Sequence, residues 1–289
     1  MSSNIDHVLL TRFNLPSKGP ENFIRSQEGW LHDRVELFER YCLPSVRRQT
    51  CKDFSWIIYF DPQSPQWLKD KISDWGREPR LTPIYREQVH REDLVHDLRR
   101  VTGAERSYLM TTNLDNDDGL AQDFVERLQG AATEEKARAV YLTHGLILNG
   151  GALYQYRDER NAFCSVVETW SDPVSCWVDW HNRLADHMSI TEINGAPGWL
   201  QVVHGRNVSN RVRGRRVAAA PYTAFFGELI GDVRDPQWRD KAQERLWHTP
   251  RRLSYEVTRS AVKQITLVIG GKSALDKVKG ALQRVRADT

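Results

Sequence analysis

The sequence predicts an α/β domain in which helices flank a mixed, mostly parallel β-sheet. Three observations support this fold class. Apolar and β-branched runs alternate with amphipathic helical segments over the first 130 residues, polar residues directly follow several of these runs, and closely spaced strand-like runs come after residue 130. Strands that alternate with helices are typical of βαβ units, which build parallel sheets covered by helices on both faces.

The first half of the chain supplies the alternating elements. Residues 7–13 form an apolar run followed by a loop rich in Gly and Pro, as expected of a buried strand that ends at the surface. Apolar side chains then recur every three to four residues from Trp30 to Val46, which is the spacing of one helix face. Further strands are predicted at 54–60, 81–85 and 108–112, and further helices at 65–75, 94–101 and 122–128.

The second half of the chain begins with strand-like runs that follow one another closely. Strand-like runs are expected at 139–143, 146–148, 152–156 and 163–167, and Asn149-Gly150 is a signal for a type I′ hairpin turn. Residues 177–188 have a helical pattern, and charged helical segments are expected at 236–248, 253–264 and at the end of the chain. We therefore expect one domain over residues 1–230 and a helical C-terminal extension over residues 231–289 that packs on the same domain.

Composition limits the classes of function. The chain has 289 residues, 40% of them apolar and 27% charged, which is enough for a sizeable core. A formal net charge of +3 gives no global field that would favour nucleic acid as a partner. The four cysteines lack metal-ligand spacing, the start lacks a signal-peptide pattern, and no apolar run reaches about 20 residues. We expect a cytoplasmic protein with at most peripheral membrane contact; these features do not specify its oligomeric state.

The strongest candidate for chemistry is the acidic segment 115–118, which follows the predicted strand 108–112. It places Asp115, Asp117 and Asp118 within four residues, and their mutual repulsion favours either a bound cation or full solvation. Hard cations such as Mn²⁺ and Mg²⁺ bind carboxylate oxygens together with phosphate oxygens and water. Asp115 and Asp117 are therefore candidate ligands of a divalent metal. An acidic turn that caps the following helix is the alternative interpretation.

Two other acidic motifs fit less well. A calcium-binding loop that begins at Asp115 would need an oxygen ligand and then a glycine where this chain has Gly119 and Leu120. Phosphatases that form an aspartyl-phosphate also use a strand followed by Asp-x-Asp, usually near the start of the domain and with a Thr at the position of Gly119. Neither pattern matches this mid-chain segment.

Polar residues also end the first two predicted strands. Thr11 and Arg12 end the first, and Asp61 ends the second. Ligands on parallel sheets bind at the carboxyl ends of strands. We therefore expect these residues to lie with the acidic segment along one edge of the sheet.

The segment 202–207 is a second candidate site. A short apolar run leads to His204, Gly205 and Asn207, an arrangement suited to a histidine that completes a metal shell or contacts a diphosphate. A structural histidine is the alternative. Five arginines lie between residues 206 and 216, and they could bind phosphates, lie near an anionic membrane surface, or form an exposed loop.

Several of these motifs resemble one known family. The segments HVLLTRFN (7–14), YCLPSVRRQT (41–50), FSWIIYFD (54–61), TTNLDNDDGL (111–120) and WLQVVHGRNVSN (199–210) are similar to the bacterial rhamnosyltransferase family, a likeness that covers roughly residues 5–230. The order of elements likewise resembles the Rossmann-like GT-A glycosyltransferase fold. The resemblance implies a metal-dependent glycosyltransferase with a nucleotide-sugar donor, dTDP-rhamnose, and a growing saccharide as the acceptor.

The same resemblance implies roles for single residues. Asp61 would contact the base or ribose of the donor, and Arg12 would contact the diphosphate or base through its planar donor fork. A turn-forming role is the alternative for Asp61. The remaining residues of the implied donor site are Thr11, Asn113, Asp115 and Asn207. From the resemblance we expect a basic residue at the position where this chain has Asn113.

An inverting transferase also needs a carboxylate base that takes the proton from the acceptor hydroxyl. Glu192 is our candidate among the five acidic residues from 168 to 192, because we expect it in a turn flanked by Gly and Pro shortly before His204. Two other functions remain open. One is a metal-dependent phosphohydrolase that uses the same acidic segment, and the other is a non-catalytic nucleic-acid-binding protein that uses the arginines at 206–216.

Overall fold

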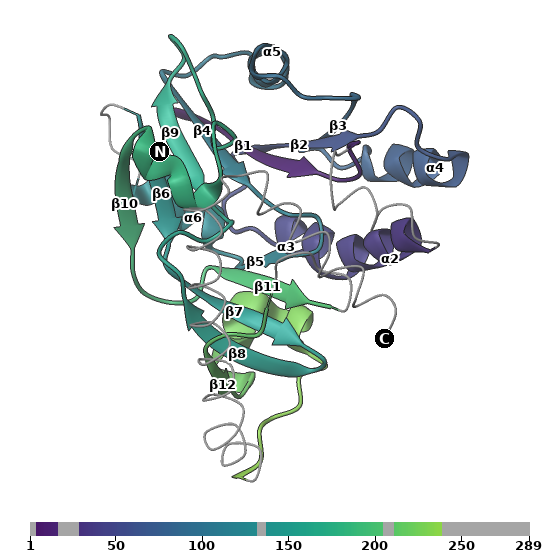
Figure 1. Ribbon diagram of the computed structural model, residues 1–289, viewed down its shortest axis with the longest axis vertical. Coiled ribbons are helices and arrows are strands. Elements are labelled where there is room, and N and C mark those ends of the chain that lie inside the picture. The colour runs from purple at the N-terminus through teal and green to yellow at the C-terminus, as the bar shows by residue number, and fades with distance from the viewer. Residues whose placement is uncertain (1–3, 17–28, 132–136, 205–210, 239–289) are drawn as a thin grey trace, which may run out of the picture.

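A computed structural model describes residues 4–16, 29–131, 137–204 and 211–238 of the 289-residue chain. These residues form two sheets that lie one above the other along the long axis, with helices around them (Figure 1). The larger sheet has seven strands in the order β10-β6-β9-β4-β1-β2-β3. Their bounds are β1 Ile5–Arg12, β2 Ser55–Phe60, β3 Leu81–Tyr85, β4 Tyr108–Asn113, β6 Arg138–Leu142, β9 Ser165–Thr169 and β10 Ser189–Ile193.

The larger sheet is mostly parallel, which confirms the predicted fold class. β1 pairs in parallel with β2 and with β4, β2 with β3, and β6 with β10, whereas β9 runs antiparallel to both β4 and β6. The strands other than β9 therefore end at one edge of the sheet, which we call the carboxyl edge. The opposite edge is the amino edge.

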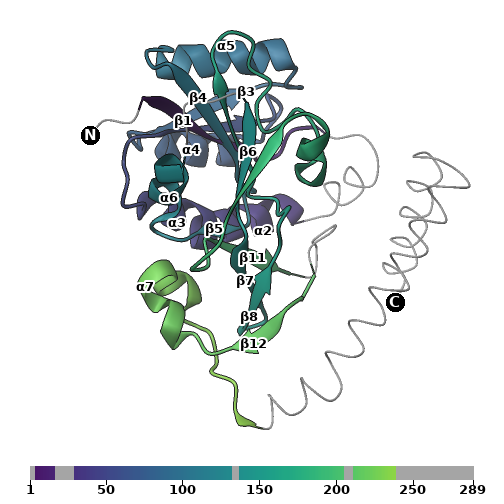
Figure 2. The ribbon, with the colours of Figure 1, turned by 90° about the vertical axis from the view of Figure 1, so that its left-hand side faces the viewer.

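Helices cover both faces of the larger sheet, so its strands are apolar on both sides. α2 (Trp30–Leu37), α3 (Leu43–Arg47), α4 (Gln66–Trp75) and α6 (Phe124–Ala131) lie on one face and α5 (Arg91–Thr102) on the other (Figures 1 and 2). Alternate residues of β1 show this division. Leu9 packs into the core on the side of α2 and α6, whereas Val8 and Leu10 pack into the core on the side of α5.

A π-helical segment, η1 (Phe38–Cys42), joins α2 to α3 within the helix predicted over 30–46. Pro44 has no N–H to donate to the carbonyl of Arg40, so the regular α-helical pattern cannot continue through this turn. The N–H of Leu43 instead bonds to the carbonyl of Phe38, one residue further back. The segment packs Phe38 against the larger sheet and Tyr41 against the smaller one.

The smaller sheet has five strands among the described residues, in the order β12-β8-β7-β11-β5. The predicted hairpin is present, because β7 and β8 are antiparallel and Asn149 pairs with Ala152. The two turn residues are Gly150 and Gly151, with φ of 55° and 78°, so the turn lies one residue beyond the predicted pair. The bounds are β5 Gly119–Leu120, β7 His144–Asn149, β8 Ala152–Arg157, β11 Trp199–Val203, β12 Arg215–Val217, with the short helices η3 Ala220–Tyr222, α7 Thr223–Phe226 and η4 Gly227–Ile230 packed nearby.

Trp199 links the two sheets. Its buried ring stacks on Phe163, with 5.2 Å between centroids, and its Nε1 donates to the carbonyl of Leu142 at 2.9 Å. The paired residue on β7 is Gly145, where a Cβ would come within 2.0 Å of the indole. Gly145 therefore provides the space for Trp199, which fixes β11 relative to the larger sheet.

Three predictions differ from the structure or fall largely outside it. Half of residues 177–188 form a 3-10 helix, η2 (His181–Asp186), and the rest are turns, bends and coil, so the predicted continuous helix is absent. Residues 189–193 form the edge strand β10, so Glu192 lies in a strand, and its predicted place in a turn is wrong. The predicted helical extension lies outside the described residues except for residues 231–238, which are largely turn and coil. No helix in the described part of the chain is long and apolar enough to cross a membrane.

Candidate active site

The carboxyl edge brings the predicted polar clusters together. Arg12 ends β1, Asp61 directly follows β2, and Asn113 ends β4, where it aligns with Leu10 of β1. β1 lies between β2 and β4, so these residues are neighbours in the middle of the edge. The expectation that these clusters gather at one edge is confirmed.

The acidic segment 115–118 is a tight turn that β1 and the loop after it hold in place. The hydroxyl of Thr11 donates to the carbonyl of Leu114 at 2.8 Å, and the amide of Asn116 donates to the carbonyl of Phe13 at 2.7 Å. These contacts fix the backbone that carries the three carboxylates.

Thr11 has a supporting position in this geometry. Its side chain is fully buried, and its hydroxyl accepts a hydrogen bond from Nε1 of Trp56 at 2.9 Å while it donates to Leu114. The hydroxyl already donates its one proton inside the protein, so it has none left for a ligand. The contact between Thr11 and the donor stays a prediction.

Asp117 is buried and has Arg34 and His204 as partners. Its Oδ2 accepts from Nη1 of Arg34 at 2.7 Å and lies 3.0 Å from Nε2 of His204. Nη1 of Arg34 also donates to Oδ1 of Asn116 at 2.8 Å. Burial opposes the ionisation of Asp117, but Arg34 and His204 outweigh it and lower its pKa. Asp117 is thus an ionised carboxylate that is already compensated.

Asp115 and Asp118 are less well compensated. Asp115 remains accessible to solvent, but the protein around it removes part of its hydration, and this, together with the charge of Asp117, raises its pKa. Oδ1 of Asp118 accepts from the N–H of Val202 at 2.8 Å, whereas its buried Oδ2 has no hydrogen-bond partner among the described residues. Burial and the charges of Asp117 and Asp115 raise the pKa of Asp118 well above its usual value. The turn therefore favours a positive charge.

The oxygen ligands at this turn suit a hard cation, provided that substrate and water complete the shell. No group of three or more His, Cys, Asp or Glu side chains in the described ranges is arranged to hold a metal ion. Mg²⁺ commonly binds one or two carboxylates plus substrate phosphates and water. Asp115 and Asp117 can supply those carboxylates. His204 contacts Asp117 in this geometry, and its role as a metal ligand stays a prediction.

Arg12 and Trp177 lie next to the acidic turn. The Arg12 guanidinium stacks on the Trp177 ring at 3.9 Å from the centroid, and the indole Nε1 donates to Oδ1 of Asn113 at 2.8 Å. Nδ2 of Asn113 donates to the carbonyl of Ala162 at 2.9 Å and to Oδ1 of Asp115 at 3.3 Å. Arg12 is exposed, and its guanidinium places a planar cation at this edge.

Asp61 forms a turn at the end of β2. Its Oδ1 accepts from the N–H of Gln63 at 2.8 Å, and its own N–H donates to Oδ1 of Asn14 at 3.0 Å. Nδ2 of Asn14 donates to Oγ of Ser64 at 3.0 Å, which ties the loop after β1 to the loop after β2. The turn-forming alternative is therefore present. The contact of Asp61 with a base or ribose stays a prediction.

Glu192 lies near the carboxyl end of β10 and is exposed. Its Oε1 accepts from Nη1 of Arg160 at 2.8 Å. β6 and β9 separate β10 from β4, so Glu192 is three strand spacings, roughly 14 Å, from the strand that leads to the acidic turn. The structure brings Glu192 to the correct edge but does not place it beside Asp115, and its role as the base stays a prediction.

The remaining predicted residues fall in the region after β11. Asn207 and Arg206 lie outside the described residues. Arg215 and Arg216 belong to β12, which pairs with β8 at the edge of the smaller sheet, and Nη1 of Arg213 donates to the hydroxyl of Tyr156 at 3.4 Å. Arg215 and Arg216 therefore belong to a sheet edge, whereas Arg211 and Arg213 lie in the coil before it.

Sequence reasoning missed Arg34, Asn14 and Trp177. Arg34 had a usable signal, because it shares the apolar helix face of Leu31, Val35 and Phe38, where a charged side chain needs a buried partner. Asn14 and Trp177 had no local signal. Their contacts join residues that are far apart in the sequence.

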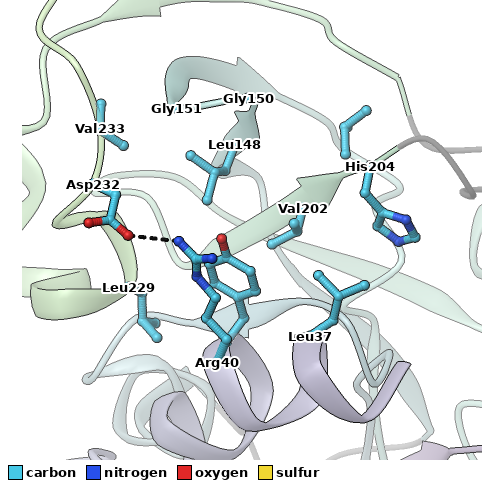
Figure 3. Close-up of a pocket in the computed structure, with 12 residues that line it drawn as sticks. Leu37, Arg40, Leu148, Gly150, Gly151, Val202, His204, Leu229, Asp232 and Val233 are labelled. Carbon is cyan, nitrogen blue, oxygen red and sulfur yellow. Dashed lines mark hydrogen bonds and ion pairs between the residues drawn. The ribbon is translucent and has the colours of Figure 1, made fainter. Parts of the chain in front are cut away.

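A pocket of about 260 Å³ opens beside His204. Figure 3 shows that apolar side chains line most of it, among them Leu37 from the end of α2, Leu148 from β7 and Val202 from β11. Arg40 and Asp232 form an ion pair of 2.7 Å at one side. The pocket extends the site from the acidic turn toward the smaller sheet.

Comparisons with known proteins place this site in a family. A family model described as "Putative rhamnosyl transferase" matches residues 6–216. No curated protein sequence matches the chain significantly. Among solved structures, S. aureus TarS is 9% identical with a TM-score of 0.44 over 68% of this chain and 37% of TarS. A structure of S. aureus TarS 1–349 in complex with UDP is 8% identical with a TM-score of 0.41 over 68% of this chain and 60% of that one.

These structural likenesses are distant. The inositol-1-phosphate CTP transferase from T. maritima is 11% identical, with a TM-score of 0.36 over 70% of this chain and 90% of that one. The chain spans only 37% and 60% of the two TarS structures. The family match, in contrast, includes both the acidic turn and His204. The chain therefore belongs to the "Putative rhamnosyl transferase" family.

Proposed function

We propose that this protein is a glycosyltransferase that moves a rhamnosyl group from a nucleoside diphosphate donor, such as dTDP-rhamnose, to a saccharide hydroxyl. The observation that carries the proposal is the accessible Asp115 carboxylate beside the ion-paired Asp117 at the carboxyl edge. Parallel sheets bind ligands at this edge. The excess negative charge of the turn supports binding of a cation that a diphosphate shares.

Asp115 and Asp117 would hold a Mn²⁺ or Mg²⁺ ion, with His204 as a third candidate ligand. When bound, the ion neutralises the charge that develops on the departing diphosphate. Arg34 keeps Asp117 ionised and oriented through its 2.7 Å contact. The exposed guanidinium of Arg12 offers a second positive group to the diphosphate.

The donor nucleotide would lie over the carboxyl ends of β1 and β2. Asp61 would accept hydrogen bonds from its base or ribose, and the contacts between Asn14 and the loop after β2 hold Asp61 in place. Asn113 is assigned to the donor site by its position at the end of β4, and Asn207 by the family resemblance.

Transfer would proceed with inversion at the anomeric carbon. The acceptor oxygen bonds to that carbon as the bond from the carbon to the diphosphate oxygen breaks, and the hydroxyl proton passes to a carboxylate base. We assign the base to Glu192, which must then separate from Arg160. Glu192→Gln should lower kcat with little change in the KM for the donor, and an unchanged kcat would remove Glu192 from this role.

Ligand-dependent melting tests the proposed function directly. The melting temperature should rise with dTDP, UDP, GDP or CDP in the presence of Mn²⁺, because a ligand that binds only the folded state stabilises it. Asp115→Asn should lose the Mn²⁺-dependent part of the shift. If none of these nucleotides with Mn²⁺ stabilises the wild type, the proposal fails.

Product analysis separates the transferase from its rivals. Slow hydrolysis of the nucleotide-sugar by a transferase yields free sugar and nucleoside diphosphate, whereas a phosphohydrolase yields sugar phosphate or inorganic phosphate. A nucleic-acid-binding protein would leave the donor intact and bind oligonucleotides with a steep salt dependence.

A further inference from the structure

Residues 174–187, which we call the arm, follow β4 toward the carboxyl edge. The N–H of Cys176 donates to Oγ1 of Thr111 at 2.8 Å, and Nε1 of Trp177 donates to Oδ1 of Asn113 at 2.8 Å. Residues 111 and 113 lie on the same face of β4, since side chains alternate along a strand. The arm therefore runs along β4 to the acidic turn.

Glu168 holds the start of the arm. Its Oε2 accepts from the N–H of Val174 and its Oε1 from the N–H of Ser175, each at 2.8 Å. Ser175 has a φ of 66°, a left-handed conformation that is costly for a residue with a side chain and needs surrounding contacts to persist. These contacts fix the arm rather than leaving it as a loose loop.

His181 is held through both its ring and its backbone. Its Nδ1 bonds to the carbonyl of Arg160, and its own carbonyl accepts from the hydroxyl of Tyr141. Because a carbonyl oxygen only accepts, Nδ1 carries the proton, and Nε2 of the neutral ring is an acceptor. No described residue forms a hydrogen bond with Nε2.

His181 lies in the part of the arm that is linked to the acidic turn. Nε1 of Trp177, four residues earlier, donates to Oδ1 of Asn113, and Nδ2 of Asn113 donates to Oδ1 of Asp115. The arm therefore presents a hydrogen-bond acceptor near the carboxylate that we place at the donor diphosphate.

Trp180, the residue before His181, is 62% exposed. Tyr85, Trp180 and Trp238 are the exposed large apolar side chains of the described ranges. The backbone of Trp180 is fixed, because its N–H donates to Oδ1 of Asp179 at 2.8 Å and its carbonyl accepts from the N–H of Arg183 at 2.8 Å. An exposed flat ring on a fixed backbone is suited to packing against the apolar face of a sugar.

We propose that the arm binds the acceptor saccharide, with the Trp180 ring packed against one face of a pyranose and Nε2 of His181 accepting a hydrogen bond from one of its hydroxyl groups. This inference rests on the proposed transferase function and adds the surface that binds its saccharide acceptor. It also predicts that the acceptor approaches from the side of Asp115, opposite the side of Arg34 and His204.

Substitution of Trp180 tests the stacking contact. Saturation-transfer-difference NMR with methyl α-rhamnopyranoside, methyl β-glucopyranoside and methyl β-galactopyranoside should show binding of at least one glycoside to the wild type. Trp180→Ala should weaken that binding roughly tenfold, whereas Trp180→Tyr, which keeps a flat ring, should stay near wild type. Trp238→Ala is the matched control, because Trp238 is 73% exposed and follows η4 at the far end of the described chain.

Substitution of His181 tests the polar contact. Asn in place of His181 can still donate to the carbonyl of Arg160 but has no group at the position of Nε2. His181→Asn should therefore keep the wild-type melting temperature and bind the glycoside severalfold more weakly. A purely structural histidine would give a lower melting temperature with unchanged glycoside affinity, and that result would overturn its assigned role.

Two results would overturn the proposal as a whole. One is equal glycoside affinity in the wild type and Trp180→Ala, and the other is no binding of any of these glycosides to the wild type. Stabilisation by nucleoside diphosphate and Mn²⁺, measured on the same samples, tests the proposed transferase function separately. If Trp180→Ala retains that stabilisation and loses the glycoside, the arm is the acceptor surface.

Discussion

The amino and carboxyl edges of the larger sheet differ in how far their polar and charged side chains find partners within the protein. At the amino edge, polar side chains satisfy one another inside the protein. Oδ2 of Asp6 accepts from Nε1 of Trp170 at 3.0 Å and from the N–H of Arg106 at 3.2 Å, and Nε2 of His7 lies 2.9 Å from Oγ1 of Thr112. Because these side chains already have hydrogen-bond partners within the protein, they do not need a ligand to satisfy them.

At the carboxyl edge, the described residues do not fully compensate the carboxylates. Asp117 has its cation in Arg34, but Asp115 and Asp118 both have raised pKa values through burial and mutual repulsion. A sequence optimised for stability alone would not leave a buried carboxylate oxygen without a partner. The comparison teaches that stability and function are divided between the two ends of the same strands.

Substitution of Asp115 should give the largest loss of activity, and it tests this division between stability and function. Asp115→Asn should lower turnover at least about 100-fold, because the site loses a ligand for the charge on the diphosphate. The melting temperature of the ligand-free protein should be unchanged or slightly higher, since repulsion with Asp117 and Asp118 decreases. Steady-state kinetics and calorimetry check both parts. Asp74→Asn on exposed α4 is the control, and near-wild-type turnover in Asp115→Asn would contradict the proposed site.

The ion pair of Arg34 and Asp117 should contribute both to stability and to activity. Arg34→Met should destabilise the protein by about 2–3 kcal/mol, because it leaves Asp117 buried without its cation. Asp117→Asn should cost a similar amount and also abolish Mn²⁺-dependent activity. The double variant should lose less stability than the sum of the two single variants, as measured by urea unfolding. Additive losses would show that the 2.7 Å ion pair contributes little.

The junction between the two sheets should depend on packing rather than on charge. Gly145→Ala should destabilise the protein by about 2 kcal/mol, because its Cβ would overlap the indole of Trp199. Gly130→Ala in α6 is the matched control; no atom lies within 4 Å of its added Cβ, and alanine favours a helix. The two variants should therefore shift the free energy of unfolding in opposite directions. Equal effects would mean that Trp199 can move without cost.

The parallel half of the larger sheet could be predicted because its information is local. β1 to β4 are apolar runs of five to eight residues, separated by amphipathic helices and followed by polar residues. β10 could not be predicted in this way, since it is an edge strand whose residues are largely exposed and its pairing with β6 is a tertiary contact. Because this strand was not predicted, Glu192 was expected in a turn.

The candidate site shows the same limit. Asp115 and Asp117 stand in one short motif, so sequence pattern was enough to select them. Arg34 contacts Asp117 from 83 positions away, and no local pattern specifies that pairing. The arm is harder still, because its path depends on the buried Glu168, the left-handed Ser175 and hydrogen bonds to β4.

The last prediction concerns the pH dependence of stability and belongs to the amino edge. Burial lowers the pKa of His7 from its ordinary value of 6.5 to about 3, with Asp53 opposing the shift. The unfolded chain therefore binds a proton below pH 6.5 that the folded protein does not, so this contribution to stability is complete above pH 6.5 and is lost as the pH falls toward 3. Each pH unit in this window should cost up to about 1.4 kcal/mol. His7→Gln stays neutral and keeps a donor for Thr112, so urea unfolding between these pH values should show a flatter slope for this variant than for wild type. An equal slope would mean that the acid sensitivity of the fold arises elsewhere, and the carboxylates of the carboxyl edge would then be the next groups to test.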